Sequence, residues 1–234
     1  MDWINSTWRV AAALIFIGLL ATVGCKEDEP IEIPFEKEVY TYQSVMIGTQ
    51  EWMAEDLKNN SFCTDEPIPE VKETAQWVAI SKPGWSYVEN NKEKNGTLGK
   101  LYNWYAVSDE RNICPCGWHV PTWDDLMELE AFLGGEDKAG GMMKTTGTIE
   151  AGDGLWYEPN TGATNSTGFS GIPNGARYSD GTFFFAPYGA VWWTANGNYL
   201  DPNPSTYQLT HTSEKLLVGN GEKKDGFAVR CLRD

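Results

Sequence analysis

The placement of the cysteines constrains this fold more than any other feature of the sequence. Cys114 and Cys116 are separated by a single proline in the stretch NICPCGWHVPTWDDL, and two further cysteines, Cys63 and Cys231, lie far from them. Cysteines this close cannot bond to each other without strain, so in an oxidising compartment each would bond to a distant partner. Two arrangements remain: 114 with 231 and 63 with 116, or the reverse.

The N-terminus indicates the compartment. Arg9 precedes an unbroken apolar run over residues 10–20, which is too short to span a bilayer and is typical of the core of a secretory signal. The run leads into ATVGC, which resembles the motif at which bacterial lipoproteins are cleaved before an acylated cysteine. We therefore expect a signal peptide over residues 1–24 and a lipid on Cys25.

The segment that follows the signal is acidic. It continues with KEDE, which resembles the export signal of lipoproteins in the Bacteroidetes group, and its acids and prolines show no apolar periodicity. We predict a tether over residues 25–38 and one folded domain over residues 39–234. We also predict that the protein lies on the outer membrane, lipid-anchored and facing the cell surface.

The net charge narrows the range of partners. The chain carries 33 acidic and 18 basic side chains, a formal charge of −15 at pH 7. Such a surface repels phosphate backbones and anionic lipid headgroups. We therefore expect no nucleic-acid partner and no membrane attachment besides the lipid anchor, whereas neutral ligands, cations and basic proteins stay open.

Two segments have the period of a helix. LYNWYAV, residues 101–107, spaces its apolar side chains at helical intervals. Residues 122–133 begin with a capping pattern, Thr122 and Asp125, and stop at a pair of glycines. One face of the second helix is expected to be buried: Trp123, Leu126, Leu129, Phe132 and Leu133.

The helical period disappears after residue 154. Glycine is abundant at 24 residues, aromatics reach 13%, and short aromatic runs alternate with turn signals such as Asn196-Gly197. These features predict an α+β domain with long ordered loops. We expect strands near residues 175–178, 183–185 and 191–194, and a last strand, GFAVRCL, with Phe227, Val229 and Cys231 on one side.

Six blocks together resemble one family, the Fibrobacter succinogenes major paralogous (FISUMP) domain. They are IGTQEWMAEDLK, GKLYNWYAV, CPCGWHVPT, GATNSTGFSGIPNGAR, VWWTANG and GFAVRC, in family order between residues 45 and 234. The resemblance implies a C-type-lectin-like fold of two helices, small antiparallel sheets and a long loop region. It also implies cysteines at 114 and 231, which favours a bridge between Cys114 and Cys231 and an additional one between Cys63 and Cys116.

Metal and catalytic chemistry have less support. Zinc held by Cys114, Cys116, His119 and a remote cysteine is an alternative, but zinc sites more often space two cysteines by two residues. The chain has no G-x-S-x-G and no H-E-x-x-H, and its only histidines are His119 and His211. We expect His119 to be a hydrogen-bonded structural residue and the protein not to be an enzyme. A glycosidase with carboxylates from distant loops is one catalytic alternative. The other follows from the resemblance, because formylglycine-generating enzymes have a related fold, but these enzymes use a redox-active cysteine pair, whereas the four cysteines here are expected to form disulfides.

The stretch WYEPN suggests calcium. Glu-Pro-Asn is the triplet with which mannose-type C-type lectins chelate calcium, and oxygens of Glu158, Asn160, Asn165 and Asn196 are suitable ligands. However, WWTANG lacks the Trp-Asn-Asp that completes such a site. We therefore expect no metal and no cofactor, with calcium-dependent sugar binding as the alternative.

Aromatic side chains in the loops favour metal-free binding, because indole and phenol faces stack on sugars. The expected function is a surface binding module for a glycan or a protein, and the alternative is a structural envelope component without a small-molecule ligand. Since Trp192 and Trp193 are adjacent on an alternating strand, one of them is expected to fill the core. The predicted ligand-binding residues, between about 152 and 204, are Trp156, Tyr157, Glu158, Asn160, Tyr188, Trp192, Trp193 and Asn196.

Overall fold

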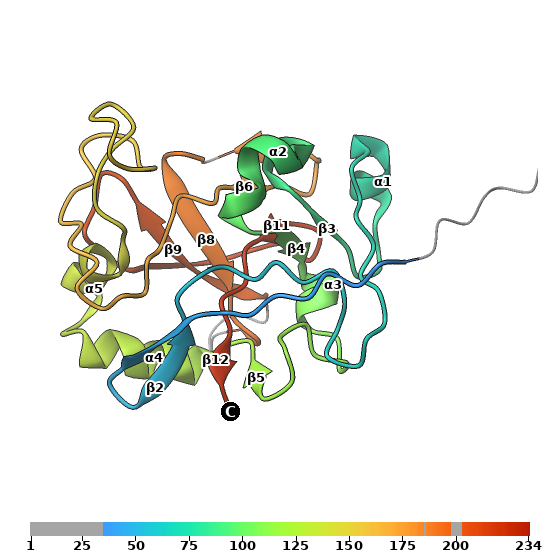
Figure 1. Ribbon diagram of the computed structural model, residues 1–234, viewed down its shortest axis with the longest axis horizontal. Coiled ribbons are helices and arrows are strands. Elements are labelled where there is room, and N and C mark those ends of the chain that lie inside the picture. The colour runs from blue at the N-terminus through green and yellow to red at the C-terminus, as the bar shows by residue number, and fades with distance from the viewer. Residues whose placement is uncertain (1–34, 185, 198–202) are drawn as a thin grey trace, which may run out of the picture. The chain divides into compact units, whose positions relative to one another are not determined.

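The computed structural model describes residues 35–184, 186–197 and 203–234. Residues Phe35–Asp234 form one compact unit with three small antiparallel sheets and two substantial helices, a mixed α+β architecture (Figure 1). Within the residues described, none of the helices is long and apolar enough to cross a membrane. The predicted signal peptide, Cys25 and most of the tether lie outside the described residues.

The first sheet brings the beginning and the end of the compact unit together. β1 (Ser44–Ile47) and β2 (Gln50–Met53) form a hairpin through Gly48, whose φ of 64° suits glycine. β12 (Leu232–Arg233) pairs with β2 on one side and with β5 (Trp118–His119) on the other. The C-terminal strand therefore holds the N-terminal hairpin against the cysteine-rich stretch.

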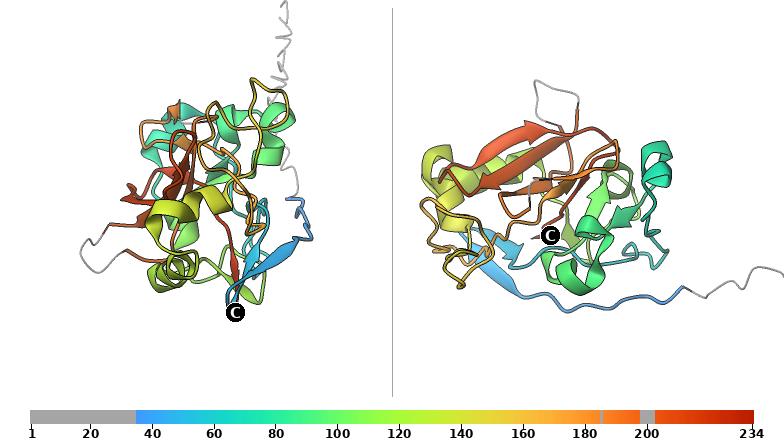
Figure 2. Two further views of the ribbon diagram at one scale, coloured as in Figure 1. Left: turned by 90° about the vertical axis from the view of Figure 1, so that its left-hand side faces the viewer. Right: turned by 90° about the horizontal axis from the view of Figure 1, so that it is seen from above.

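The other two sheets come from the middle and the end of the chain. The three-stranded sheet has the order β10-β9-β8 and is coloured orange to red in Figure 2. The five-stranded sheet has the order β3-β4-β11-β6-β7. The strands are β3 (Trp85–Ser86), β4 (Leu101–Asn103), β6 (Ala176–Arg177), β7 (Phe183–Phe184), β8 (Gly189–Trp193), β9 (Ser205–Thr210), β10 (Leu217–Asn220) and β11 (Gly226–Phe227).

The helix α4 (Trp123–Phe132) begins as predicted. The Thr122 side chain accepts from the Asp125 amide, and the Asp125 carboxylate accepts from the Thr122 amide. Leu126, Leu129 and Leu133 are buried and Trp123 is partly buried, but the prediction for Phe132 is wrong because this ring is 62% exposed. It covers Gly48 in the β1–β2 turn, where an added Cβ would lie 2.9 Å from the ring.

The helix α5 (Glu136–Met143) was not expected, because EDKAGGMM contains two glycines and has low helix propensity. The glycines serve packing. A Cβ on Gly140 would lie 2.2 Å from the Lys215 carbonyl oxygen, and one on Gly141 would lie 2.4 Å from that of Gly162. The shorter helical segments are α1 (Thr74–Ala79), η1 (Val88–Asn90), α2 (Lys92–Asn95), η2 (Gly96–Leu98) and α3 (Trp104–Val107).

The prediction of a helix over residues 101–107 is half wrong. Its first three residues form β4, which pairs with β3 and with β11. Only Trp104–Val107 is helical, and it starts at Asn103, whose side chain accepts from the Ala106 amide at 3.1 Å. Pairing on both edges outweighs the helical spacing of the apolar residues.

Strand β8 separates two hydrophobic cores, and all five of its residues are buried. Trp193 packs in the core that contains Tyr102 and Phe227, whereas Trp192 packs in the core that contains Trp52 and Tyr207. The predicted last strand divides into β11 and β12, yet its alternation is confirmed. Phe227, Val229 and Cys231 line the first core, and Ala228 and Leu232 the second.

Two disulfides join the cysteines in the pairing that the family resemblance implies. Cys63 bonds to Cys116 and Cys114 to Cys231, with Cα atoms 5.2 and 6.1 Å apart. The zinc alternative is therefore wrong, since these sulfurs are bonded to one another. Disulfides of this kind indicate an oxidising compartment outside the cytoplasm.

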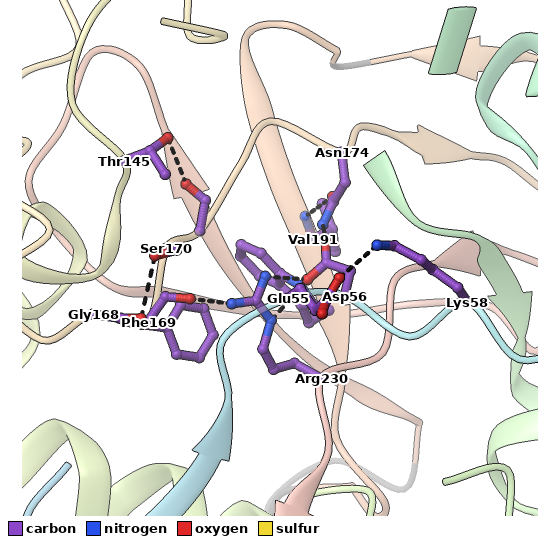
Figure 3. Close-up of polar contacts among 12 residues, drawn as sticks. Glu55, Asp56, Lys58, Thr145, Gly168, Phe169, Ser170, Asn174, Val191 and Arg230 are labelled. Carbon is purple, nitrogen blue, oxygen red and sulfur yellow. Dashed lines mark hydrogen bonds and ion pairs between the residues drawn. The ribbon is translucent and has the colours of Figure 1, made fainter. Parts of the chain in front are cut away.

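A buried ion pair links the two ends of the compact unit (Figure 3). Arg230 Nε donates to Asp56 Oδ1 at 2.8 Å, and both residues are almost completely buried. The same carboxylate accepts from Trp192 Nε1 at 2.7 Å and from Asn174 Nδ2 at 2.9 Å, while Arg230 also donates to the carbonyl of Phe169. The network satisfies the charges and fixes the loop around Phe169.

Candidate functional site

Three of the predicted binding residues are core residues, so this part of the prediction is wrong. Trp156, Trp192 and Trp193 are all 0% exposed. Each indole N–H bonds inside the protein: that of Trp156 to Thr145 Oγ1 at 3.0 Å, and that of Trp193 to the Tyr102 carbonyl at 2.7 Å. With faces and edges occupied, these side chains cannot bind a ligand, and both tryptophans of β8 fill the core rather than one.

Two predicted tyrosines do lie together on the surface. The rings of Tyr157 and Tyr188 are 4.9 Å apart, and the residues are 40% and 41% exposed. His211 joins them, with its ring 6.0 Å from Tyr157 and 5.4 Å from Tyr188. We call these three side chains the aromatic platform. They come from three loops that are distant in the sequence.

Backbone hydrogen bonds hold the platform in place. The amide of Tyr157 donates to the Pro187 carbonyl at 3.3 Å, and that of His211 donates to the Tyr188 carbonyl at 2.9 Å. His211 Nδ1 lies 2.6 Å from the Glu158 carbonyl oxygen. Since a carbonyl only accepts, Nδ1 carries the proton, and Nε2 of the neutral ring is an acceptor.

A buried lysine fixes the neighbouring backbone. Lys144 is 0% exposed, and its Nζ donates to the carbonyls of Thr161, Thr210 and Ser213 at 2.8, 2.9 and 2.8 Å. Burial lowers the pKa of Lys144 to about 8. Because Thr210 precedes His211 directly, this ammonium group joins the end of α5 to the backbone that presents the platform.

The predicted polar residues have different places. Asn160 is buried, and its Nδ2 donates to the carbonyls of Thr145 at 3.0 Å and Gly147 at 2.9 Å. Glu158 is exposed beside the platform. Asn196 lies at the start of α4, where its side-chain oxygen accepts from the Trp123 amide at 2.8 Å, so the prediction that Asn196 contacts the ligand is not supported.

These placements also bear on the calcium alternative. The side-chain oxygen of Asn165 accepts from the Ser170 amide at 2.9 Å, and that of Asn196 is used at α4. Two of the four expected oxygen ligands are therefore already bonded to backbone amides.

An apolar hollow adjoins the platform. Its cavity volume is about 320 Å³, near the lower end of the range for ligand pockets. Leu155 and Tyr157 flank the buried Trp156, and Pro187 precedes Tyr188, so hollow and platform share two loops. Its apolar walls are formed by Val88, Leu98, Ile149, Leu155, Pro173, Ala186 and Pro187.

A second hollow contains His119 but has a structural explanation. His119 Nδ1 lies 2.8 Å from Asp234 Oδ1, and Nε2 lies 3.5 Å from Asp125 Oδ2. Asp125 is engaged in the cap of α4. His119 thus links β5 to the helix and the C-terminal strand, and its hydrogen bonding agrees with the prediction.

A comparison with known families bears on the six sequence blocks. The model of the Fibrobacter succinogenes major domain matches residues 45–233. The chain belongs to this family. No curated protein and no solved structure matched the chain.

The six FISUMP blocks supply residues of the buried cores and do not supply the residues of the aromatic platform. Asp56, Cys114 and Arg230 come from these blocks and are buried in the cores. Tyr157, Tyr188 and His211 all lie between the blocks. The part of the surface most suited to a ligand is therefore supplied by segments outside the family motifs.

Two parts of the site were missed from the sequence. His211 follows β9, and no local pattern relates it to Tyr157. The hollow was missed because Ile149 and Leu155 read as scattered apolar residues, although the alternation of Leu155, Trp156 and Tyr157 indicates that one side chain points inward and two outward.

Proposed function

We propose that this FISUMP protein is a lipid-anchored binding module on the outer face of the outer membrane, with a glycan or a protein as its ligand, and that it is not an enzyme. The two substantial helices, small sheets and long loops support a C-type-lectin-like fold for the module. The signal-like N-terminus with Cys25 supports the anchor, and two disulfides are suited to an extracellular domain.

The observation that carries this proposal is the aromatic platform beside the apolar hollow. Tyr157 and Tyr188 are about two-fifths exposed and held by backbone hydrogen bonds, so little conformational freedom is lost on binding. Tyrosine faces suit both sugar rings and protein side chains, and the hydroxyl and imidazole edges add hydrogen bonds.

A glycan-array screen of the fragment over residues 30–234, with and without calcium, tests the proposal together with a matching peptide array. Replacing Tyr157 and Tyr188 by alanine is expected to weaken binding of any ligand found by about tenfold or more. The matched control is Tyr178→Ala, because Tyr178 is 39% exposed and stacks on Phe184 instead. If the platform variant and Tyr178→Ala lose the same amount of affinity, or if neither variant changes the affinity, the platform has no role in binding.

A second candidate function is assembly into a surface structure. β1 is an edge strand, and Met46 on it is 60% exposed. Phe132 nearby is 62% exposed and lines a further hollow of about 590 Å³. Apolar edge strands of this kind pair with other chains. Analytical ultracentrifugation of the fragment over residues 30–234 tests this function. The function requires that the fragment self-associates and that Met46→Lys abolishes the association.

A further inference from the structure

The loop half of the molecule has an unusual charge distribution. Between residues 145 and 214 the only lysine or arginine is Arg177, whereas six acids occur in the same range. Arg177 is 0% exposed, and its guanidinium donates to the carbonyls of Val71 and Lys72. Lys144, which precedes this range, is also fully buried. No lysine or arginine of this range therefore offers a positive charge to a ligand.

Carboxylates lie beside both parts of the site. Glu150 Oε2 accepts from the Glu158 amide at 3.1 Å, which places the Glu150 carboxylate at the backbone that carries Tyr157. Glu158 itself is exposed and follows Tyr157. Glu89 lines the apolar hollow. The platform thus has negative charge beside it within a protein of formal charge −15.

The hollow is poorly suited to a sugar. Seven of its ten lining residues are apolar, so most hydroxyl groups of a buried sugar would lose their hydrogen bonds to water without replacement. An aliphatic side chain has no such cost, and burying it is favourable by about 1.5–3 kcal/mol. The shape and chemistry of the hollow therefore favour a polypeptide.

We propose, building on the binding function above, that the ligand is a segment of a basic protein. A lysine or arginine side chain of the partner lies over Tyr157 and Tyr188, where the ring faces and the carboxylates of Glu150 and Glu158 attract it. An aliphatic side chain next to it enters the apolar hollow. The acidic loop face at the same time repels anionic glycans and nucleic acids.

Fluorescence anisotropy with labelled twelve-residue peptides tests this proposal on the chain from residue 26 to its end. The probe contains one leucine flanked by arginines. One matched peptide has glutamine in place of each arginine, and another has serine in place of the leucine. Both replacements are expected to weaken binding by about tenfold or more, and added salt weakens binding of the probe.

Protein variants locate the contact. Tyr157→Ala, Glu150→Gln and Leu155→Ser are each expected to weaken probe binding, by about threefold to tenfold. Glutamine at 150 keeps an oxygen for the Glu158 amide, so the loop is retained. The controls are Glu110→Gln and Phe132→Ala, which change an exposed acid and an exposed ring on other elements and are expected to leave binding unchanged.

The outcomes separate this inference from the proposed function. Glycan binding that depends on Tyr157, without binding of the basic peptide, would overturn the basic partner and leave the binding module standing. If Glu110→Gln weakens peptide binding as much as Glu150→Gln does, the peptide is attracted only by the overall negative charge of the protein. That result would also overturn the inference. If no glycan and no peptide binding depends on Tyr157, both proposals fail.

Discussion

Asp56 and Arg230 are 174 residues apart in the sequence and share one buried hydrogen-bond network. Removing one partner of such a pair leaves an uncompensated charge in the core. We therefore expect Asp56→Ala to lower the free energy of unfolding by about 3–5 kcal/mol, measured by urea denaturation. The control is Lys37→Ala at the exposed pair with Asp65, which should cost less than about 1 kcal/mol. Similar values for the two variants would contradict this account.

Lys144 predicts a pH dependence of stability. Burial lowers its pKa to about 8 in the folded protein, whereas a lysine in an unfolded chain titrates near about 10.4. Between these values the unfolded chain binds more protons, so this contribution makes the free energy of unfolding rise with pH. Lys144→Met removes the contribution. The free energy of unfolding of the unchanged protein, relative to that of Lys144→Met, should be higher at about pH 9.5 than at about pH 7.5 in urea denaturation. The same difference at both pH values would contradict the lowered pKa of Lys144.

Single residues show where sequence reasoning worked for the site. Tyr157 and Tyr188 were predicted from the aromatic side chains of the loops, and Glu158 from the Glu-Pro-Asn triplet. The structure brings the two tyrosines together. Trp156, Trp192 and Trp193 were misplaced, because an exposed and a buried aromatic ring look alike in a sequence without a clear period. His211 depends on a tertiary contact that no local pattern encodes.

The helices show how local and tertiary signals compete at the scale of elements. α4 was predictable because its cap, its apolar period and its terminal glycines all agree. α5 was not predictable, since its glycines lower helix propensity and are required only by the close approach of backbone from residues 162 and 215. Residues 101–103 have a helical spacing, but pairing of β4 with two strands overrides it.

Gly141 provides a test in which two effects have opposite signs. In an isolated helix Gly141→Ala would stabilise by about 1 kcal/mol. Here the added Cβ would lie 2.4 Å from the Gly162 carbonyl oxygen, so we expect a net loss of about 1–3 kcal/mol in thermal or urea unfolding. Gly96→Ala is the control, since its nearest contact is Lys92 Cγ at 3.7 Å. A stabilised Gly141→Ala would show that α5 does not pack this closely.

The disulfides act on the whole molecule. Cys114–Cys231 closes a separation of 117 residues and Cys63–Cys116 one of 53. In the chain-entropy model, replacing the first pair by serine costs about 5 kcal/mol and the second about 4 kcal/mol. Cys114 and Cys231 also pack in the first core, which adds to their effect. The double variant without Cys114–Cys231 is therefore expected to have the lower denaturant midpoint of the two. A lower midpoint for the double variant without Cys63–Cys116 would contradict this account.

The disulfides and the fold class of the whole molecule were more predictable from the sequence than the aromatic platform was. The family blocks implied the disulfide pairing, and the glycine-rich, aromatic composition predicted the mixed α+β class. The platform lies between the blocks, and β9 and β10, which position His211, gave no strong sequence signal. The platform depends on contacts between loops that are distant in the sequence, and no local pattern encodes these contacts.

The central claim is that the aromatic platform and apolar hollow form the ligand face. Hydrogen–deuterium exchange with a saturating ligand from the arrays tests it most directly. The account predicts slower exchange in residues 149–161, 186–190 and 209–213, and no change over residues 44–50 and 123–133. Protection confined to the second set, around β1 and α4, would contradict it and favour the assembly function.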